Sequence, residues 1–281
     1  EQYAIEDLAD RGSSYGIESH VIDGNNIIDV YNVISKVSKS IRKNPKPVLL
    51  EFKTFRMKGH EEASGQDYIE SSLIEEWAKK DPIKNYERFL VKEKILSKDS
   101  IKKTRNKIAK EIDKDWKDAN SLPEVIFNQE KELLDVFKNH KAVIEVNNSN
   151  SSENIRFVDS IKDGIDEAME EHDNLVIMGQ DIAEYGGVFK ITEGLIHKYG
   201  KNRVFNTPLC ESSILSASYG MSIGGFKTIV EMQFSDFISS GFTAIVNLIA
   251  KSNYRWSQNS DIVVRMPCGG GVGAGPFHSQ T

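Results

Sequence analysis

Residues 157–178 read FVDSIKDGIDEAMEEHDNLVIM, in which a helical pattern runs directly into an apolar stretch. The first part repeats apolar side chains at the spacing of one helix face, at Phe157, Ile161, Ile165 and Met169. The run Leu175–Met178 has no polar alternation, which is typical of a strand that is buried on both faces. A helix followed by a buried strand is the repeating unit of an α/β fold.

The same alternation extends outward in both directions from this unit. On its C-terminal side the pattern predicts apolar-rich helices and two further strands, at residues 211–224, 235–255, 226–231 and 262–265. Near the N-terminus it predicts helix, strand, helix and strand in turn, at residues 5–15, 19–22, 27–41 and 48–52. We therefore predict an α/β fold with parallel sheets flanked by helices, in parts of two related domains.

The two halves are expected to be joined by a charged helical segment and a polar linker. Residues 71–139 are rich in lysine and in acidic residues, and this interleaving favours a solvated helix face over a nucleic-acid contact. The run Asn147–Ser152 has no apolar side chain that could anchor it. We therefore predict a first domain with a helical extension at residues 1–146, a linker at residues 147–153 and a second domain at residues 154–281.

Composition excludes several classes of protein. The 281 residues carry a net charge of −6, which argues against a protein built around a nucleic-acid backbone. No apolar run approaches the ~18–20 residues that a membrane-spanning helix requires, so we expect no membrane protein. Cys210 and Cys268 cannot form a disulfide framework and stand in no zinc-binding spacing, so we expect a reducing, cytoplasmic location.

A glycine-rich segment follows the last expected strand and ends near His278. Gly269, Gly271 and Ala274 formally satisfy the dinucleotide-binding pattern G-x-G-x-x-A. That pattern requires a helix to begin within it, whereas Gly275-Pro276 follows in this sequence, so we predict a loop with positive φ angles instead. His278 is then either a structural loop histidine or a proton donor that titrates near neutrality.

Two other places carry groups suited to chemistry, and each has a plain structural alternative. Glu211 precedes an apolar helix, where an acid either favours the helix macrodipole or shares a proton with a ring nitrogen. Arg56 and His60 flank Gly59 where a strand runs out into a loop, which suits a bound phosphate or an ordinary basic loop. The residues alone leave both pairs of alternatives open.

Several longer strings of residues resemble one known enzyme family. They are Tyr199–Glu211, which reads YGKNRVFNTPLCE, Tyr185–Phe189, which reads YGGVF, and Arg265–Gly271 leading to His278–Gln280. The chain resembles the thiamine diphosphate-dependent decarboxylating component of the 2-oxoacid dehydrogenase complexes. Residues 1–140 are similar to the later part of its alpha subunit and residues 154–281 to the first part of its beta subunit, which implies a fusion of the two.

The resemblance implies a thiamine diphosphate-binding fold and a role for each candidate residue. Glu211 matches the carboxylate that hydrogen-bonds the aminopyrimidine ring of the cofactor, and Phe237 falls where the family places an aromatic wall beside that ring. His60 and Arg56 match a histidine and an arginine near the diphosphate. His278 matches a histidine placed for proton transfer during acyl transfer to lipoamide. The implied catalytic set is therefore Glu211, His278 and His60, with thiamine diphosphate and Mg²⁺ as cofactors.

The family also implies a reaction and partners. The reaction is oxidative decarboxylation of a 2-oxo acid, with acyl transfer to lipoyl-lysine of a dihydrolipoyl acyltransferase core, and this sequence looks most like the branched-chain members. The implied assembly is a homodimer of fused chains. The alternatives are a pyruvate or acetoin dehydrogenase component, another transketolase-like enzyme, and a catalytically inactive assembly module.

Two departures from the family pattern concern the cofactor region. The glycine-aspartate-glycine motif that holds Mg²⁺ would lie before Glu1, so no metal ligand is assigned within this sequence. Residues 1–281 alone are accordingly expected to be a fragment without turnover. Gln180 stands where the family often has glutamate before Asp181, and the sequence offers no physical account of its effect.

Overall fold

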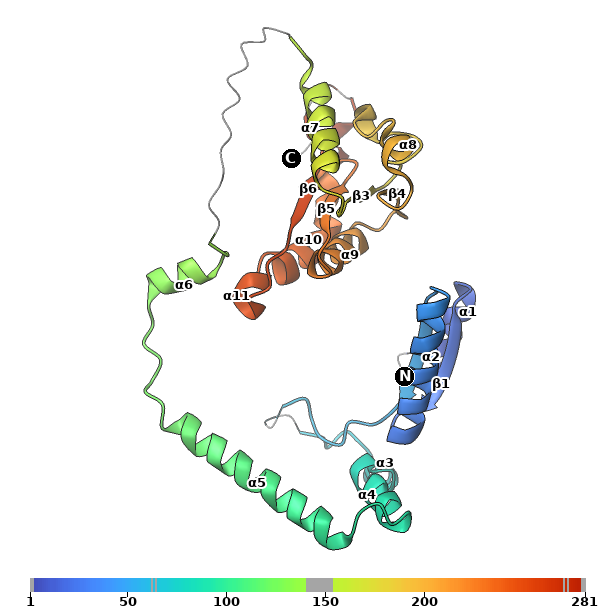
Figure 1. The fold of residues 1–281 in the computed structure, drawn as a ribbon, viewed down its shortest axis with the longest axis vertical. Helices are drawn as coiled ribbons and strands as arrows, with labels where there is room; N and C mark the ends of the chain where they lie inside the picture. The colour runs from blue at the N-terminus through green and yellow to red at the C-terminus, as the bar shows by residue number, and fades with distance from the viewer. Residues whose placement is uncertain are drawn as a thin grey trace. The chain divides into compact units, whose positions relative to one another are not determined.

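The computed structural model describes residues 3–61, 63, 65–139, 154–269, 271 and 273–278. The chain divides into two compact units, Glu1–Glu124 and Val125–Thr281, and each unit has its own sheet (Figure 1). The expected linker at residues 147–153 lies outside the described residues. The domain boundaries expected from the sequence remain predictions, and residues 125–139 group with the second unit rather than with the first.

The first unit contains a two-stranded parallel sheet. Its first elements are, in order, η1 (Leu8–Asp10), α1 (Arg11–Ser14), β1 (Glu18–Asp23), α2 (Ile27–Lys43) and β2 (Val48–Lys53). Strands β1 and β2 pair in one register from Glu18↔Val48 to Asp23↔Lys53, and α2 is the crossover between them. The helix expected at residues 5–15 is shorter, because a 3-10 turn leads into one turn of helix that ends before Gly16, whose φ is +67°.

Helix α2 begins and ends at signals in its own sequence. The Asn26 side chain caps its first turn by accepting a hydrogen bond from the Ile28 N–H at 3.2 Å. The helix stops before Asn44, which precedes Pro45, because a residue before proline disfavours helical geometry. These signals explain why the predicted helix is found close to its expected bounds.

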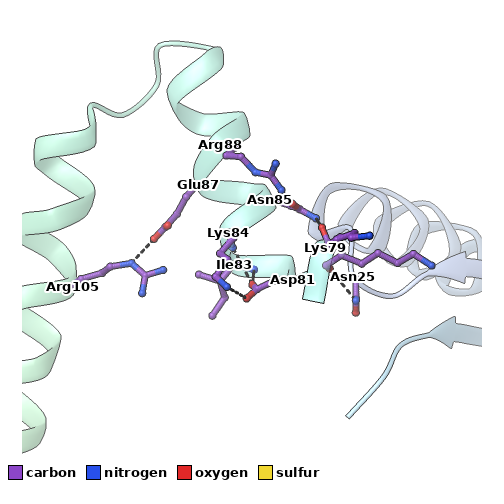
Figure 2. Close-up of polar contacts among 10 residues, drawn as sticks. Asn25, Lys79, Asp81, Ile83, Lys84, Asn85, Glu87, Arg88 and Arg105 are labelled. Carbon is purple, nitrogen blue, oxygen red and sulfur yellow. Dashed lines mark hydrogen bonds and ion pairs between the residues drawn. The ribbon is translucent and has the colours of Figure 1, made fainter. Parts of the chain in front are cut away.

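Three helices follow this sheet, namely α3 (Ser71–Lys79), α4 (Pro82–Lys92) and α5 (Lys98–Asn120). Asp81 starts α4, because its carboxylate accepts from the backbone N–H groups of Ile83 and Lys84, each at 3.0 Å. An ion pair of 2.7 Å between Glu87 of α4 and Arg105 of α5 joins the two helices (Figure 2). Helix α5 buries none of its residues, as expected of a solvated helix.

The second unit is built on a four-stranded parallel sheet in the order β4-β3-β5-β6. Its elements are α6 (Gln129–Asp135), α7 (Phe157–Glu171), β3 (Leu175–Gly179), η2 (Val188–Lys190), α8 (Leu195–Tyr199), β4 (Val204–Asn206), α9 (Glu211–Ile223), β5 (Lys227–Glu231), η3 (Ser235–Gly241), α10 (Phe242–Ala244), η4 (Ile245–Ile249), α11 (Ser252–Trp256), β6 (Ile262–Arg265) and η5 (Gly275–Phe277). Both sheets are parallel and flanked by helices, so the predicted α/β class is confirmed (Figure 1).

Side chains of the second sheet alternate between two hydrophobic cores. Leu175 and Ile177 of β3 lie in one cluster with Met169 of α7. Met178 of the same strand lies in the other cluster with Leu215 of α9. Because successive strand residues point to opposite faces, the two clusters cover the two faces of the sheet. All of β3 is buried, which confirms the prediction of a strand covered on both sides.

The helix expected at residues 235–255 is a series of four shorter elements instead. It is wound more tightly than an α-helix in η3 and more widely in the π-helical η4, so no single period continues through it. At Gly241, η3 approaches α9 so closely that a Cβ would lie 2.4 Å from Leu215 Cδ1. Elements β4 and α8 escape prediction, because three and five residues are too few to show a period.

No helix within the described residues is both long enough and apolar enough to cross a lipid bilayer.

Truncating a leucine in the second unit tests this packing. Leu215→Ala should lower the free energy of unfolding by about 2–5 kcal/mol, because the residue is 0% exposed and its removal leaves a cavity. Leu209→Ala is the matched control, since that residue is 78% exposed and its loss should change stability by no more than about 0.5 kcal/mol. Urea denaturation measures both, and equal losses would contradict the assignment of Leu215 to the core.

Candidate functional site

The carboxyl edge of the second sheet gathers the candidate residues of this unit. Gln180 directly follows β3, and Glu211 is the first residue of α9, shortly after β4 ends. The Thr207 N–H donates to the Gly179 carbonyl at 2.8 Å and so joins the segments that leave these two strands. The carboxyl edge of a parallel sheet is where open α/β proteins bind their ligands.

Glu211 is a buried carboxylate with one donor beside each of its oxygens. The residue is 8% exposed. The Gln180 Nε2 donates to Oε1 at 3.1 Å, and the Ser240 Oγ donates to Oε2 at 3.2 Å. A carboxylate offers about four acceptor positions, so Glu211 can accept further hydrogen bonds from a ligand. Its burial, its neutral partners and its spare acceptor capacity fit a nitrogen-containing ring.

Three aromatic rings of the second unit form one cluster. The rings of Phe234, Phe237 and His278 meet edge to face, with centroids 5.8 Å, 4.9 Å and 5.3 Å apart. The Ser240 Oγ also lies 2.9 Å from the Phe237 carbonyl, so the Ser240 hydroxyl links the backbone of η3 to the Glu211 carboxylate. Phe237 and His278 are in ring contact with each other, and the common site of these two residues with Glu211 stays a prediction.

His278 keeps an unused polar atom in this cluster. Its Nδ1 is buried and has no hydrogen-bond partner among the described residues. A ring nitrogen of histidine can donate or accept a hydrogen bond, and the described residues leave this capacity of Nδ1 unused.

The glycine segment before His278 is a loop. Gly269, Gly271, Gly273 and Gly275 have φ angles of 145°, 89°, 72° and 67°, which side chains rarely adopt. Among the residues of this segment that the structure describes, the three-residue η5 is the only helical element, and it is too short to offer a helix N-terminus to a pyrophosphate. The prediction of a positive-φ loop rather than a dinucleotide fingerprint is confirmed.

A buried ion pair at the same edge was not expected from the sequence. Glu231 ends β5, is 2% exposed, and lies 2.7 Å from the guanidinium of Arg265 at the end of β6. Burial raises the pKa of Glu231, and the positive charge of Arg265 partly offsets that rise. The two residues are opposite each other in the sheet register. An acidic and a basic residue at the last positions of two adjacent strands could therefore have indicated this ion pair in the sequence.

Arg56 and His60 lie in the first unit, on the loop that follows β2. Both are exposed, and His60 Nε2 lies 3.9 Å from Glu61 Oε1. Accessible basic groups at the carboxyl end of a parallel strand fit an anionic phosphate group. Within the described ranges, no group of three or more His, Cys, Asp or Glu side chains is arranged to hold a metal ion.

Comparison with known families gives one match for each part of the chain. Residues 1–126 match the family described as dehydrogenase E1 component. Residues 153–281 match the family described as transketolase, pyrimidine binding domain.

Individual relatives resemble part of the chain. The 2-oxoisovalerate dehydrogenase subunit beta of Pseudomonas aeruginosa is 39% identical over 137 residues, which are 48% of this chain and 39% of that protein. The Bacillus subtilis protein of the same name is 41% identical over 129 residues, 44% of this chain and 39% of that protein. The pyruvate dehydrogenase E1 component subunit beta of Acholeplasma laidlawii is 41% identical over 128 residues, 45% of this chain and 39% of that protein. The chain thus spans about two fifths of the length of these relatives.

Removing the positive partner of Glu231 tests the buried ion pair. Arg265→Met should lower the free energy of unfolding at about pH 7 by about 3–5 kcal/mol, because it leaves an unpaired charge in the interior. Since burial raises the pKa of Glu231, the folded state takes up a proton there as the pH falls, so the loss should shrink towards about pH 5.

Lys227→Met is the matched control for this variant. It breaks the exposed ion pair with Asp261 beside the same strand and should cost at most about 1 kcal/mol. Urea denaturation at several pH values measures both variants. A loss in Arg265→Met that grows on acidification would contradict the assigned direction of the Glu231 pKa.

Proposed function

We propose that this chain acts in the oxidative decarboxylation of a 2-oxo acid. The premise is that residues 1–126 belong to the dehydrogenase E1 component family and residues 153–281 to the transketolase pyrimidine-binding family. The names of its relatives support this class, because 2-oxoisovalerate and pyruvate are both 2-oxo acids. The observation that carries the proposal is the buried Glu211 carboxylate, held by two neutral donors within the segment that matches a pyrimidine-binding domain.

Thiamine diphosphate is the cofactor that these residues fit. When bound, it supplies an electron sink for cleavage of the bond to the departing carboxyl group. Glu211 would accept a hydrogen bond from the pyrimidine ring and hold or release a proton there, as a buried acid–base group can. Phe237 would flank the ring, and Arg56 and His60 would bind the charged diphosphate with Mg²⁺ as its counterion.

His278 is proposed as the proton-transfer group of the second half-reaction. Its edge-to-face contacts with two phenylalanine rings and the unused hydrogen-bonding capacity of its Nδ1 support this role, in which the imidazole would exchange a proton with an oxygen or sulfur of the acceptor. The acceptor in this proposal is lipoyl-lysine of a dihydrolipoyl acyltransferase core, as the family resemblance implies.

The organisation proposed for the chain rests on its sequence pattern and on the family resemblance. A first domain at residues 1–146 and a second domain at residues 154–281 would be joined by a linker at 147–153, and two fused chains would assemble into a homodimer. The separate family matches of residues 1–126 and 153–281 support the division into two domains. The proposed location is cytoplasmic, because two cysteines are too few for the disulfide framework of a secreted protein.

Replacing Glu211 tests the acid–base role directly. In the assembled, cofactor-loaded protein, Glu211→Ala should lower kcat for 2-oxo acid decarboxylation by about 10²–10⁴-fold, the usual contribution of a positioned acid–base group. Decarboxylation is followed with an artificial electron acceptor, so that no acyltransferase is needed. Ser212→Ala is the matched control, because this exposed residue is the next one in α9. Unchanged turnover in Glu211→Ala would refute the proposed mechanism.

The choice of 2-oxo acid forms a separate test. We expect kcat/KM for 3-methyl-2-oxobutanoate to exceed that for pyruvate by at least about 10-fold, because one carbon atom in an apolar pocket is worth about 10–200-fold and the two acids differ by two carbon atoms. The two acids are compared as substrates in the same assay. A higher kcat/KM for pyruvate would assign the chain to the pyruvate type and leave the role of Glu211 unaffected.

A further inference from the structure

Gln180 is the closest polar partner of the carboxylate at the centre of the second unit. The residue is 5% exposed and directly follows β3. Its Nε2 donates to Glu211 Oε1 at 3.1 Å, in a hydrogen bond between two buried side chains. Its own Oε1 is buried and has no hydrogen-bond partner within the described part of the chain. One end of the amide is therefore used and the other end is spare.

We propose that Gln180 is the positioning residue of Glu211 and holds it in both of its protonation states. The amide donates through Nε2 when Glu211 is charged, and it accepts through Oε1, after a half-turn of the amide group, when Glu211 carries a proton. This inference rests on the proposed function, because only an acid–base role requires Glu211 to exchange a proton.

The chemistry of the amide explains why this residue type suits the position. An acid–base group passes through a charged and a neutral form, and in a buried place each form needs a partner of the right kind. A glutamine side chain is neutral and has donors at one end and an acceptor at the other, so it can satisfy both forms without changing its own charge. An apolar side chain would satisfy neither form.

A second carboxyl group at the same position would behave differently. Two carboxylates at hydrogen-bond distance in a buried site cannot both ionise easily, so the pair keeps one proton between them. With that proton present, the pair still contains one donor and one acceptor and resembles the amide arrangement. Once the shared proton is lost at higher pH, the two negative charges repel each other and Glu211 loses its position.

Other charged and titratable groups lie on the elements packed around this pair. They are Asp181 after β3, Cys210 before α9, Glu231 on β5, Asp236 in η3, Arg265 on β6, and His278 after η5. All of them are present in the parent protein and in each variant at position 180. A change in the pH profile that occurs only in one such variant therefore reports on the pair itself.

The test compares two substitutions in the assembled, thiamine diphosphate- and Mg²⁺-loaded protein. Gln180→Met keeps the side-chain length and removes both polar ends, and we expect kcat for decarboxylation to fall about tenfold or more at every pH, as expected when a buried hydrogen bond to a charged group is lost. Gln180→Glu should retain near-parental kcat at low pH and lose activity on the alkaline side, with a limb that the parent lacks. Gln258→Glu, the same change on a half-buried glutamine elsewhere in the unit, is the control and should keep the parental profile.

Each outcome decides the inference. Parental kcat and parental pH profiles in both Gln180 variants would overturn it. A loss that follows a lowered melting temperature, with an unchanged pH profile in Gln180→Glu, would also overturn it, because it would show a packing role only. Glu211→Ala is measured in parallel: if this variant is inactive while the Gln180 variants are unaffected, the inference fails and the proposed function stands. If Glu211→Ala is fully active, the proposed function itself fails.

Discussion

The burial of β3 on both of its faces is the constraint on which the rest of the second unit depends. A strand without a solvent-facing side must have helices on each face. Its side chains alternate between two hydrophobic cores and so give the helices on both faces apolar contacts. Polar groups can then enter only where the strand ends. Gln180, Glu211, Glu231 and Arg265 all lie at that edge, and because they are buried or nearly so they need partners there.

The two buried glutamates at this edge differ in the charge of their neighbours. Glu231 faces the full positive charge of Arg265, which keeps it as one half of a structural ion pair. Glu211 accepts hydrogen bonds from a neutral amide and a hydroxyl and forms no ion pair within the described part of the chain. Different surroundings allow two carboxylates in one protein to take different roles, and the role we propose for Glu211 is proton transfer.

Periodicity and end signals were sufficient to predict the α/β class, the buried strand β3 and helix α2, whereas the asparagine cap of α2 was found only in the structure. They also indicated Glu211 and His278 as candidates, although each had a plain structural alternative. The partners of Glu211 could not be predicted, because Gln180 and Ser240 lie 31 and 29 residues away and are brought near only by the sheet and by η3. The division of residues 235–255 into helices of different types could not be predicted either, because it depends on the close approach of Gly241 to Leu215.

The hydroxyl of Ser240 has a consequence of its own. It lies within reach of two acceptors, the Glu211 carboxylate and the Phe237 carbonyl, yet it has a single hydrogen to give. The hydrogen is therefore either shared between the two acceptors or given fully to one of them. Whenever the hydrogen turns to the backbone of η3, one oxygen of Glu211 is left vacant, and an arriving molecule can occupy that place without first having to displace a protein donor.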